Sequence, residues 1–294
     1  MTDPWDSAPL LAVGAAVGFA VSGIFLKRAL QHASPLAAAV VSVACTTVFI
    51  WALVGATLPL ALVVRREVLP FVVAGLAAPG LARLVLFAGI DRVGVSRSSA
   101  LVATAPLFAI VMAVLVLGEQ PSPALLGGAA AVVAGGALLS PRHREERAWR
   151  RLDLALPVLA AVGFALRDTV SRAGLTGFPH PLVAAGVATL ASLGIMAALA
   201  VAQRGTGRLR LESAGVPALL LAGLCEGLAY LAMWRALTVG SVSLVSPLVH
   251  TQPIFTIVLA AVFLRDLERV TWRIVMAAAL ILAGVALVLQ GRGV

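Results

Sequence analysis

Apolar runs, each about as long as a membrane-crossing helix, follow one another along nearly the whole chain. A helix needs about 20 apolar residues to cross the hydrocarbon core of a bilayer. The runs are continuous and rich in Ala, Leu and Gly, without the alternation of barrel strands, so they predict an all-α integral membrane protein. Pro, Gly and Arg between the runs separate ten transmembrane helices. We expect these helices at 8–30, 35–56, 67–90, 95–118, 123–140, 153–174, 180–202, 213–237, 241–264 and 270–290.

The two halves of the chain resemble one another in sequence, which indicates an internal repeat. The run AAVGFA occurs at 15–20 and again at 160–165. Further along, LVATAPLFAIV at 101–111 corresponds to LVHTQPIFTIV at 248–258, with a proline in register. Matched features in the same order make chance an unsatisfactory explanation of the similarity.

A unit of five helices crosses the membrane an odd number of times, so the second copy enters from the opposite side. Inverted repeats are a recurring architecture of secondary transporters, because rocking one repeat against the other exposes a central site to each side in turn. We expect a first five-helix repeat over 1–140, a basic linker loop over 141–152 and a second five-helix repeat over 153–294.

Composition agrees with this pattern, since 61% of the residues are apolar and only 12% are charged. An ordinary soluble domain has about 25% charged residues. The net charge of +9 lies in short gaps between apolar runs, so the expected partner is the lipid bilayer and no nucleic acid. Cys45 and Cys225 both lie inside apolar runs, where we expect buried thiols, with no disulfide and no metal site.

Basic residues are distributed unevenly between the two ends of the predicted helices. Of the 22 Lys and Arg residues, the connections after the odd-numbered helices hold 2, 2, 5, 3 and 3, whereas the termini and the other connections hold 5. Cytoplasmic connections of membrane proteins carry the excess of Lys and Arg. The sequence therefore predicts a multi-pass protein of the cell membrane, plasma or inner, with both termini outside the cytoplasm.

The most specific motif is SRSSALVATAPLFAIVMAVLVLGE at 96–119, which runs into LGEQPS at 117–122. With the two halves of five helices, it resembles the EamA-type family of the drug/metabolite transporter superfamily, and the likeness covers essentially the whole chain. The second copy departs from the pattern, ending in LRDLERVTW at 264–272, which weakens any role carried over from Glu119 to Asp266. The resemblance implies a transporter whose central cavity is lined mainly by helices 1, 3, 4, 6, 8 and 9. Such proteins are commonly pictured with cytoplasmic termini, opposite to the charge bias.

Ionisable side chains inside a bilayer are costly, so each one is a candidate for function. Arg83 lies in the third predicted helix and Glu226 in the eighth, both away from the helix ends. Tyr230 shares a helix face with Glu226, and the repeat alignment matches Tyr230 to Arg83. We expect all three to face one cavity, with Arg83 binding a carboxylate and Glu226 an amine or a proton. The alternative is an ion pair that only holds the helices together.

Two more candidates come from the sixth and eighth helices. Arg167 and Asp168 are adjacent, and adjacent residues point about 100° apart on a helix, so we expect one of them to line the cavity and take Asp168 as a candidate. The alternative places both near the membrane interface. Trp234, four residues after Tyr230, suits an aromatic wall for a partly apolar substrate, although packing explains it almost as well.

The ninth predicted helix contains Pro247 and Pro253, each of which removes a backbone donor and disturbs the carbonyl four residues earlier. Transporters bind substrates at such broken helices. His250 and Gln252 offer polar side chains beside the break, so we expect an irregular helix that lines the transport path. The alternative is a buried kink in which a backbone carbonyl satisfies His250.

These features predict a secondary transporter that moves small metabolites, amino acids or related amphipathic compounds, by alternating access. Nucleotide-binding motifs and acidic pairs for a magnesium pyrophosphate are absent from the sequence, so we expect no cofactor, no metal and no enzyme activity. A proton or another ion is the candidate for coupling. The alternative is an integral membrane enzyme acting on lipid or isoprenoid substrates, which would carry a cluster of acids or histidines on one face. A receptor or scaffold would instead have a collapsed cavity.

Overall fold

The computed structural model describes residues 7–139, 150–203, 209–263 and 272–291, and every regular element within these ranges is a helix. In this part of the chain, nine helical segments are long and apolar enough to cross a membrane, and one shorter apolar helix, Pro123–Leu139, accompanies them. The predicted all-helical membrane fold is confirmed. Most of the predicted basic linker lies outside the described residues.

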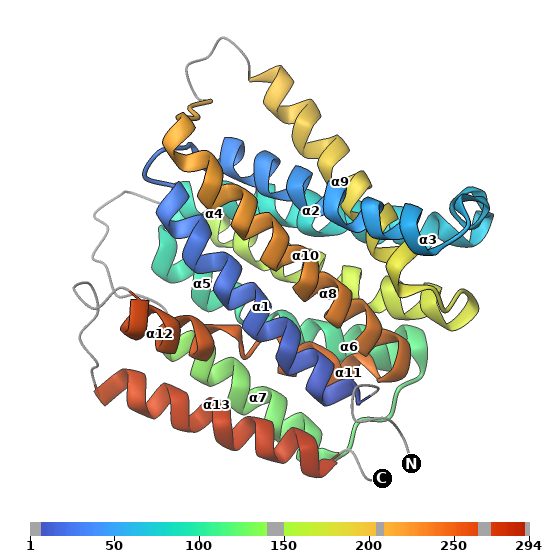
Figure 1. The fold of residues 1–294 in the computed structure, drawn as a ribbon. Coiled ribbons are helices and arrows are strands. Elements are labelled where there is room, and N and C mark those ends of the chain that lie inside the picture. The colour runs from blue at the N-terminus through green and yellow to red at the C-terminus, as the bar shows by residue number, and fades with distance from the viewer. Residues whose placement is uncertain (1–6, 140–149, 204–208, 264–271, 292–294) are drawn as a thin grey trace.

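The helices follow the predicted order closely (Figure 1). The first half holds α1 (Ala8–Ala29), α2 (Pro35–Thr57), α3 (Leu69–Gly75), α4 (Ala82–Val93), α5 (Val95–Val102), α6 (Ala105–Leu117) and α7 (Pro123–Leu139). The second half holds α8 (Ala155–Gly177), α9 (Pro181–Ala202), α10 (Val216–Val239), α11 (Val242–Val249), α12 (Gln252–Phe263) and α13 (Trp272–Gln290). Short 3₁₀ turns lie at Leu60–Val64, Arg66–Val68, Arg151–Leu154 and Ser213–Gly215.

Three of the predicted membrane helices are interrupted. The fourth is divided into α5 and α6 and the ninth into α11 and α12, and in each case a proline occupies the first turn of the second segment. Proline is well tolerated there, because the first-turn N–H has no partner within the helix. The third is divided by a π turn, Leu76–Leu81, in which Ala78 has extended backbone angles. The expected irregularity of the ninth helix is present, whereas the break in the third helix was not predicted.

Helix packing repeats when the two halves of the chain are exchanged. Helix α1 packs along α10, and its counterpart α8 packs against α3 and α4. Helix α6 contacts α8, just as α11 and α12 contact α1. Two further pairs join counterparts directly, α2 with α9 and α7 with α13, and Figure 1 shows the second pair side by side. This exchange symmetry is what two inverted repeats produce.

The symmetry extends to single atoms at two AGL sequences, 74–76 and 222–224, which occupy equivalent places in the two halves. The Ser192 hydroxyl donates to the Gly75 carbonyl at 2.7 Å, and the Thr46 hydroxyl donates to the Gly223 carbonyl at 2.7 Å. A Cβ atom on Gly75 would lie 2.0 Å from a backbone oxygen of α9, and one on Gly223 would lie 2.5 Å from a backbone oxygen of α2. Small residues let membrane helices approach this closely.

Substitution of Gly75 by Ala is therefore expected to lower the melting temperature of the detergent-solubilised protein by several degrees. The added methyl group has no room, and overpacking a helix contact costs about 1–3 kcal/mol. Gly14→Ala is the matched control, because nothing lies within 4 Å of a Cβ at that glycine of α1. Equal melting temperatures for the two variants would contradict the close α3–α9 contact.

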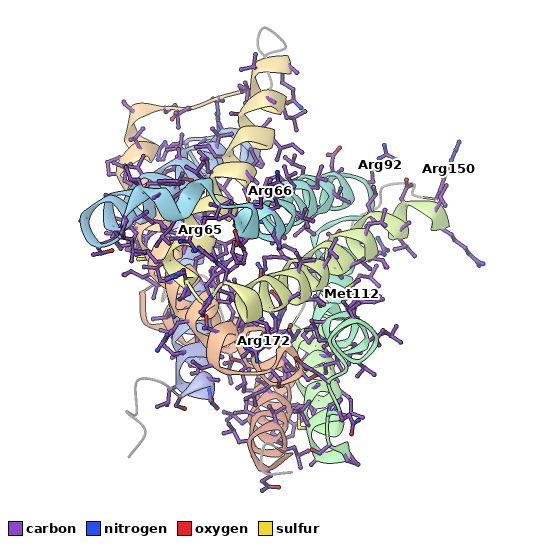
Figure 2. All side chains as sticks on the ribbon, turned by 90° about the vertical axis from the view of Figure 1, so that its right-hand side faces the viewer. Arg65, Arg66, Arg92, Met112, Arg150 and Arg172 are labelled. Atoms are coloured by element: carbon purple, nitrogen blue, oxygen red, sulfur yellow. The ribbon has the colours of Figure 1, made fainter. Side chains whose placement is uncertain are left out.

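The bundle has two distinct ends. The termini end holds the beginning of α1, the end of α13 and the turn between α10 and α11, which lie on one side of the bundle in Figure 1. The basic end holds the last turn of α1 with Lys27 and Arg28, together with Arg92 and Arg150. Figure 2 shows Arg92 and Arg150 projecting from one edge of a bundle whose outer side chains are mostly carbon.

At the basic end, the connection after α1 is tied to the connection before α10. His32 Nδ1 lies 2.9 Å from Glu212 Oε2, and Arg210 Nη1 lies 3.6 Å from Glu212 Oε1. The hydrogen bond from His32 holds the pKa of the Glu212 carboxyl below its usual range. This tie is therefore complete at neutral pH and is lost as the pH falls through that lowered pKa.

Candidate functional site

A cavity of about 240 Å³ lies among residues from the middle of the helices. Its walls come from α1, α4, α5, α8 and α10 and from the break between α11 and α12. These segments are the first, third, fourth, sixth, eighth and ninth predicted membrane helices. They are the helices that the sequence resemblance implies for a central cavity.

Arg83 and Glu226 form an ion pair in this cavity. Arg83 Nη2 lies 2.6 Å from Glu226 Oε1, and their side chains are only 20% and 4% exposed. Arg83 stands in the first turn of α4, directly after the π turn, and Glu226 lies midway along α10. The structure thus brings Arg83, Glu226 and Tyr230 to one cavity, the arrangement expected from the repeat.

The pair leaves part of the guanidinium unused. The buried Arg83 Nη1 has no hydrogen-bond partner, although guanidinium groups commonly bind carboxylates through two parallel bonds. A buried donor without a partner costs free energy, and a bound anion would remove that cost. The contact with Glu226 alone also fits the alternative of a purely structural ion pair.

In the adjacent pair of α8, one residue lines the cavity, but it is not the one chosen from the sequence. Arg167 lines the cavity, whereas Asp168, the residue chosen from the sequence, is not among the lining residues. Arg167 Nε and Nη2 donate to Asp168 Oδ1 at 2.9 and 2.7 Å. The long Arg side chain bends back along the helix to its neighbour, and therefore an angle of about 100° does not keep the two charged groups apart.

Aromatic side chains from the AAVGFA repeat complete the cavity wall. Phe19 and Phe164 occupy equivalent places in α1 and α8, and both line the cavity. The Phe19 ring meets the Tyr230 ring edge-on with centroids 5.2 Å apart, and the Arg167 guanidinium lies 5.5 Å from the Phe164 ring centre. Sequence reasoning missed these phenylalanines, although the repeated motif contained them.

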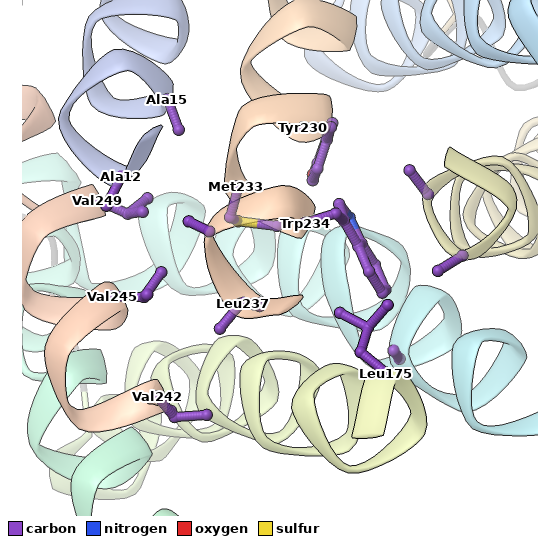
Figure 3. Close-up of a cluster of buried hydrophobic side chains, with 14 of the residues drawn as sticks. Ala12, Ala15, Leu175, Tyr230, Met233, Trp234, Leu237, Val242, Val245 and Val249 are labelled. Atoms are coloured by element: carbon purple, nitrogen blue, oxygen red, sulfur yellow. The ribbon is translucent and has the colours of Figure 1, made fainter. Parts of the chain in front are cut away.

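Trp234 lies outside the cavity, contrary to the proposed aromatic wall. It is 1% exposed and its ring meets Phe71 edge-on at 5.7 Å. Figure 3 shows Trp234 in the packed apolar cluster beside Leu175, one turn along α10 from Tyr230. A turn of helix advances about 5.4 Å, which is enough to carry Trp234 from the cavity into the core.

The break in the ninth membrane helix supplies His250 and Gln252 to the cavity wall. His250 Nδ1 lies 2.8 Å from the Ser246 carbonyl, which can only accept, so Nδ1 carries a proton. Gln252 Nε2 donates to the Phe19 carbonyl at 3.3 Å. The backbone bond expected in the buried-kink alternative is therefore present, but the two side chains still border the cavity.

Glu119, the acid of the LGEQPS motif, binds the beginning of α11 at the termini end. Its Oε1 accepts the Val242 N–H at 2.7 Å, and its Oε2 accepts the Ser243 N–H at 2.9 Å and the Ser243 hydroxyl at 2.5 Å. A carboxylate at a helix N-terminus satisfies unpaired amides and is favoured by the helix dipole. Sequence reasoning gave Glu119 no partner, and its counterpart Asp266 lies outside the described residues.

Arg172 of α8 binds the other side of the same turn. Its Nη1 donates to the carbonyls of Leu237 and Thr238 at 2.8 and 2.7 Å, at the end of α10. Charges of opposite sign therefore hold the end of α10 and the beginning of α11, each with the sign that the helix dipole favours. Of these two contacts, the one from Glu119 crosses between the two halves of the chain, whereas Arg172 and α10 both belong to the second half.

Metal-binding residues do not gather in the described part of the chain. No group of three or more His, Cys, Asp or Glu side chains comes together there in a way that could hold a metal ion.

Comparison with known proteins gives one family. The model of the EamA-like transporter family matches residues 6–140 and 153–290. Among 28 matching chains of solved structures, one titled "Crystal structure of protein" shares the fold with a TM-score of 0.82 at 17% sequence identity, covering 97% of each chain. No curated protein matches the sequence. Because the family model covers both halves and nearly the whole length, this chain belongs to the EamA-like transporter family.

Proposed function

We propose that this protein is a secondary transporter that carries small zwitterionic, partly apolar metabolites, such as amino acids or related compounds, by alternating access. The observation that carries the proposal is the Arg83–Glu226 pair in a cavity lined by six membrane helices. A substrate carboxylate would bind the free Nη1 of Arg83, and its amine would bind Glu226. Both charges of the substrate would thereby be compensated within the bilayer, where unpaired charges are costly.

The aromatic rings explain the preference for a partly apolar compound. Phe19, Phe164 and Tyr230 present apolar surface next to the charged groups. Rings of this kind contribute binding free energy mainly by burying area. A small amphipathic molecule matches this combination better than a purely polar one.

Alternating access requires closure on one side of the cavity at a time. At the termini end, the three hydrogen bonds of Glu119 join α6 of the first half to α11 of the second half. We take this contact as the closure of the termini end in this conformation, broken when the halves rock apart. A proton or another ion would supply the driving gradient.

The proposed orientation places the basic end in the cytoplasm and both termini outside the cell membrane. It rests on the excess of Lys and Arg in the connections after the odd-numbered helices, which outweighs the common picture of the family. An epitope tag at the C-terminus should react with antibody in intact cells or spheroplasts. Reaction only after permeabilisation would reverse the orientation.

Two other functions have less support in the same residues. An enzyme for lipid or isoprenoid substrates would be favoured by a cluster of acids or histidines, and the described residues contain none large enough for a metal ion. A scaffold or receptor would be favoured by a collapsed centre, whereas the described centre holds a cavity of about 240 Å³.

A thermal-shift screen tests the proposed substrate class. The purified protein should be stabilised by zwitterionic metabolites and less by their singly charged analogues, because a ligand that binds the folded state raises its stability. Compounds that stabilise the protein are then tested for flux in proteoliposomes. Stabilisation by lipids or isoprenoid phosphates alone would instead favour the enzyme.

Cysteine accessibility tests the segment at the helix break. Single cysteines at positions 250 and 252, in a protein lacking Cys45 and Cys225, should react with a water-soluble thiol reagent and be protected by substrate. Both side chains line the cavity, so water must reach them in at least one conformation. If both cysteines stay unreactive, the segment is packing only.

A further inference from the structure

A second, larger cavity of about 430 Å³ adjoins the charged one. The two share Leu86, Val102, His250 and Gln252 as lining residues, so they are neighbouring compartments that meet at these side chains. The larger compartment, called the side chamber here, is bounded by α4, α5, α7 and α12. It extends from the centre of the bundle towards the basic end.

The two compartments differ in chemistry. The charged cavity holds Arg83, Arg167 and Glu226, whereas none of the described residues that line the side chamber is charged. Its walls are mainly aliphatic, with a few polar side chains such as Ser99 and Thr256. A charged group would lose its hydration there without gaining a partner, which is costly, but an apolar group would lose nothing.

The volumes of the two compartments also indicate which part of a substrate each can hold. Ligand pockets usually measure about 300 to 1,000 Å³, so the charged cavity of about 240 Å³ has room for little more than the charged head of a metabolite. The side chamber of about 430 Å³ is large enough for an apolar side chain. The boundary between them includes His250 and Gln252 at the helix break, together with Leu86 and Val102.

Two very small residues stand side by side in the lining of the side chamber. Ala103 lies at the end of α5, and Gly136 lies on α7, where an added Cβ would come 3.4 Å from the Ala103 Cβ. Larger side chains at either position would therefore enter the chamber and reduce its volume. The sequence alone singled out neither position as a candidate.

We infer that the side chamber binds the apolar side chain of a zwitterionic substrate and that Ala103 and Gly136 set the largest side chain accepted. This inference rests on the proposed function, in which Arg83 and Glu226 bind the carboxylate and amine of that substrate. It adds a specificity determinant that is spatially separate from the charged pair.

The test compares uptake of radiolabelled L-leucine and L-alanine by proteoliposomes. Ala103→Leu and Gly136→Leu should each lower the leucine-to-alanine ratio of kcat/KM about 10-fold or more, since one methylene group in a filled apolar pocket discriminates by about that factor. Leu139→Ala, which enlarges the chamber, should raise the ratio for L-phenylalanine over L-leucine. Gly127→Leu is the matched control on α7, because Gly127 is exposed and has nothing within 4 Å of an added Cβ.

The outcomes separate the inference from the function on which it rests. Equal loss of leucine and alanine uptake in both filling variants would mean that the chamber is only an entry path, and an unchanged ratio would mean that substrates do not reach it. Either result overturns the inference while the proposed function stands. If the unaltered protein transports none of the three amino acids, the proposed substrate class fails and the inference fails with it. The enlarging variant keeps the test decisive where a filling variant does not fold.

Discussion

Arg83→Ala should abolish uptake of zwitterionic substrates, lowering the rate in proteoliposomes about 100-fold or more. The change removes the guanidinium that is bonded to Glu226 and leaves that carboxylate, 4% exposed, without its cation. Breaking a buried ion pair by removing one partner costs about 3–5 kcal/mol, so part of the loss will be lower stability. Transport and melting temperature must therefore be measured on the same preparations.

The control is the double variant Arg83→Gln, Glu226→Gln. Two amides can keep a hydrogen bond between α4 and α10 without burying a charge, so the double variant should recover much of the melting temperature. It should not recover transport, because neither amide can bind a substrate charge by ion pairing. Normal transport by the double variant would show that the Arg83–Glu226 contact only holds the bundle together.

Glu119→Ala should shift the equilibrium between the conformations of the carrier, because it weakens closure of the termini end. This is the second largest effect that we expect. Three hydrogen bonds to the beginning of α11 are lost, and bonds to charged groups contribute about 1.5–3 kcal/mol each. We expect the equilibrium to shift towards the conformation open at the termini end. A cysteine at position 250 should then react at least 10-fold faster with a membrane-impermeant reagent added from that side.

Glu67→Ala provides the matched control, because Glu67 is an exposed acid at the same end of the bundle. It should leave the labelling rate within about twofold of the parent. Slower labelling in the Glu119 variant, or equal acceleration in both variants, would mean that the Glu119 contact does not hold the two halves together at that end.

The predicted helices were accurate wherever the apolar runs decide the outcome. Helix α1 spans Ala8–Ala29 against an expected 8–30, since a run bounded by charge leaves few other solutions in lipid. The third helix was different, because Pro79 and Gly80 lie inside an apolar run. The sequence shows that Pro79 lacks a backbone N–H. Whether the neighbouring helices accommodate a break at Ala78 depends on tertiary packing, which no local sequence pattern contains.

The charged residues of the cavity were predictable where the free-energy cost of a charge in the bilayer is enough to single them out. Arg83 and Glu226 stand out in the sequence because a charged side chain inside a bilayer is costly and is found there mainly where it is paired or functional. The choice between Arg167 and Asp168 was not predictable, since it depends on how a flexible side chain bends. The partner of Glu119 was also hidden, because Ser243 is far away in sequence and becomes a neighbour only when the two halves pack together.

Solute counterflow tests the central claim most directly. Proteoliposomes are loaded with an excess of the unlabelled zwitterion that stabilises the protein best, and the labelled compound is added outside in trace amounts. A carrier with one alternately exposed site should accumulate label transiently above its equilibrium level, without any ion gradient, and Arg83→Ala should remove this overshoot. Label that never exceeds equilibrium with the unaltered protein, or an overshoot that persists in Arg83→Ala, would contradict a carrier working through the Arg83–Glu226 site.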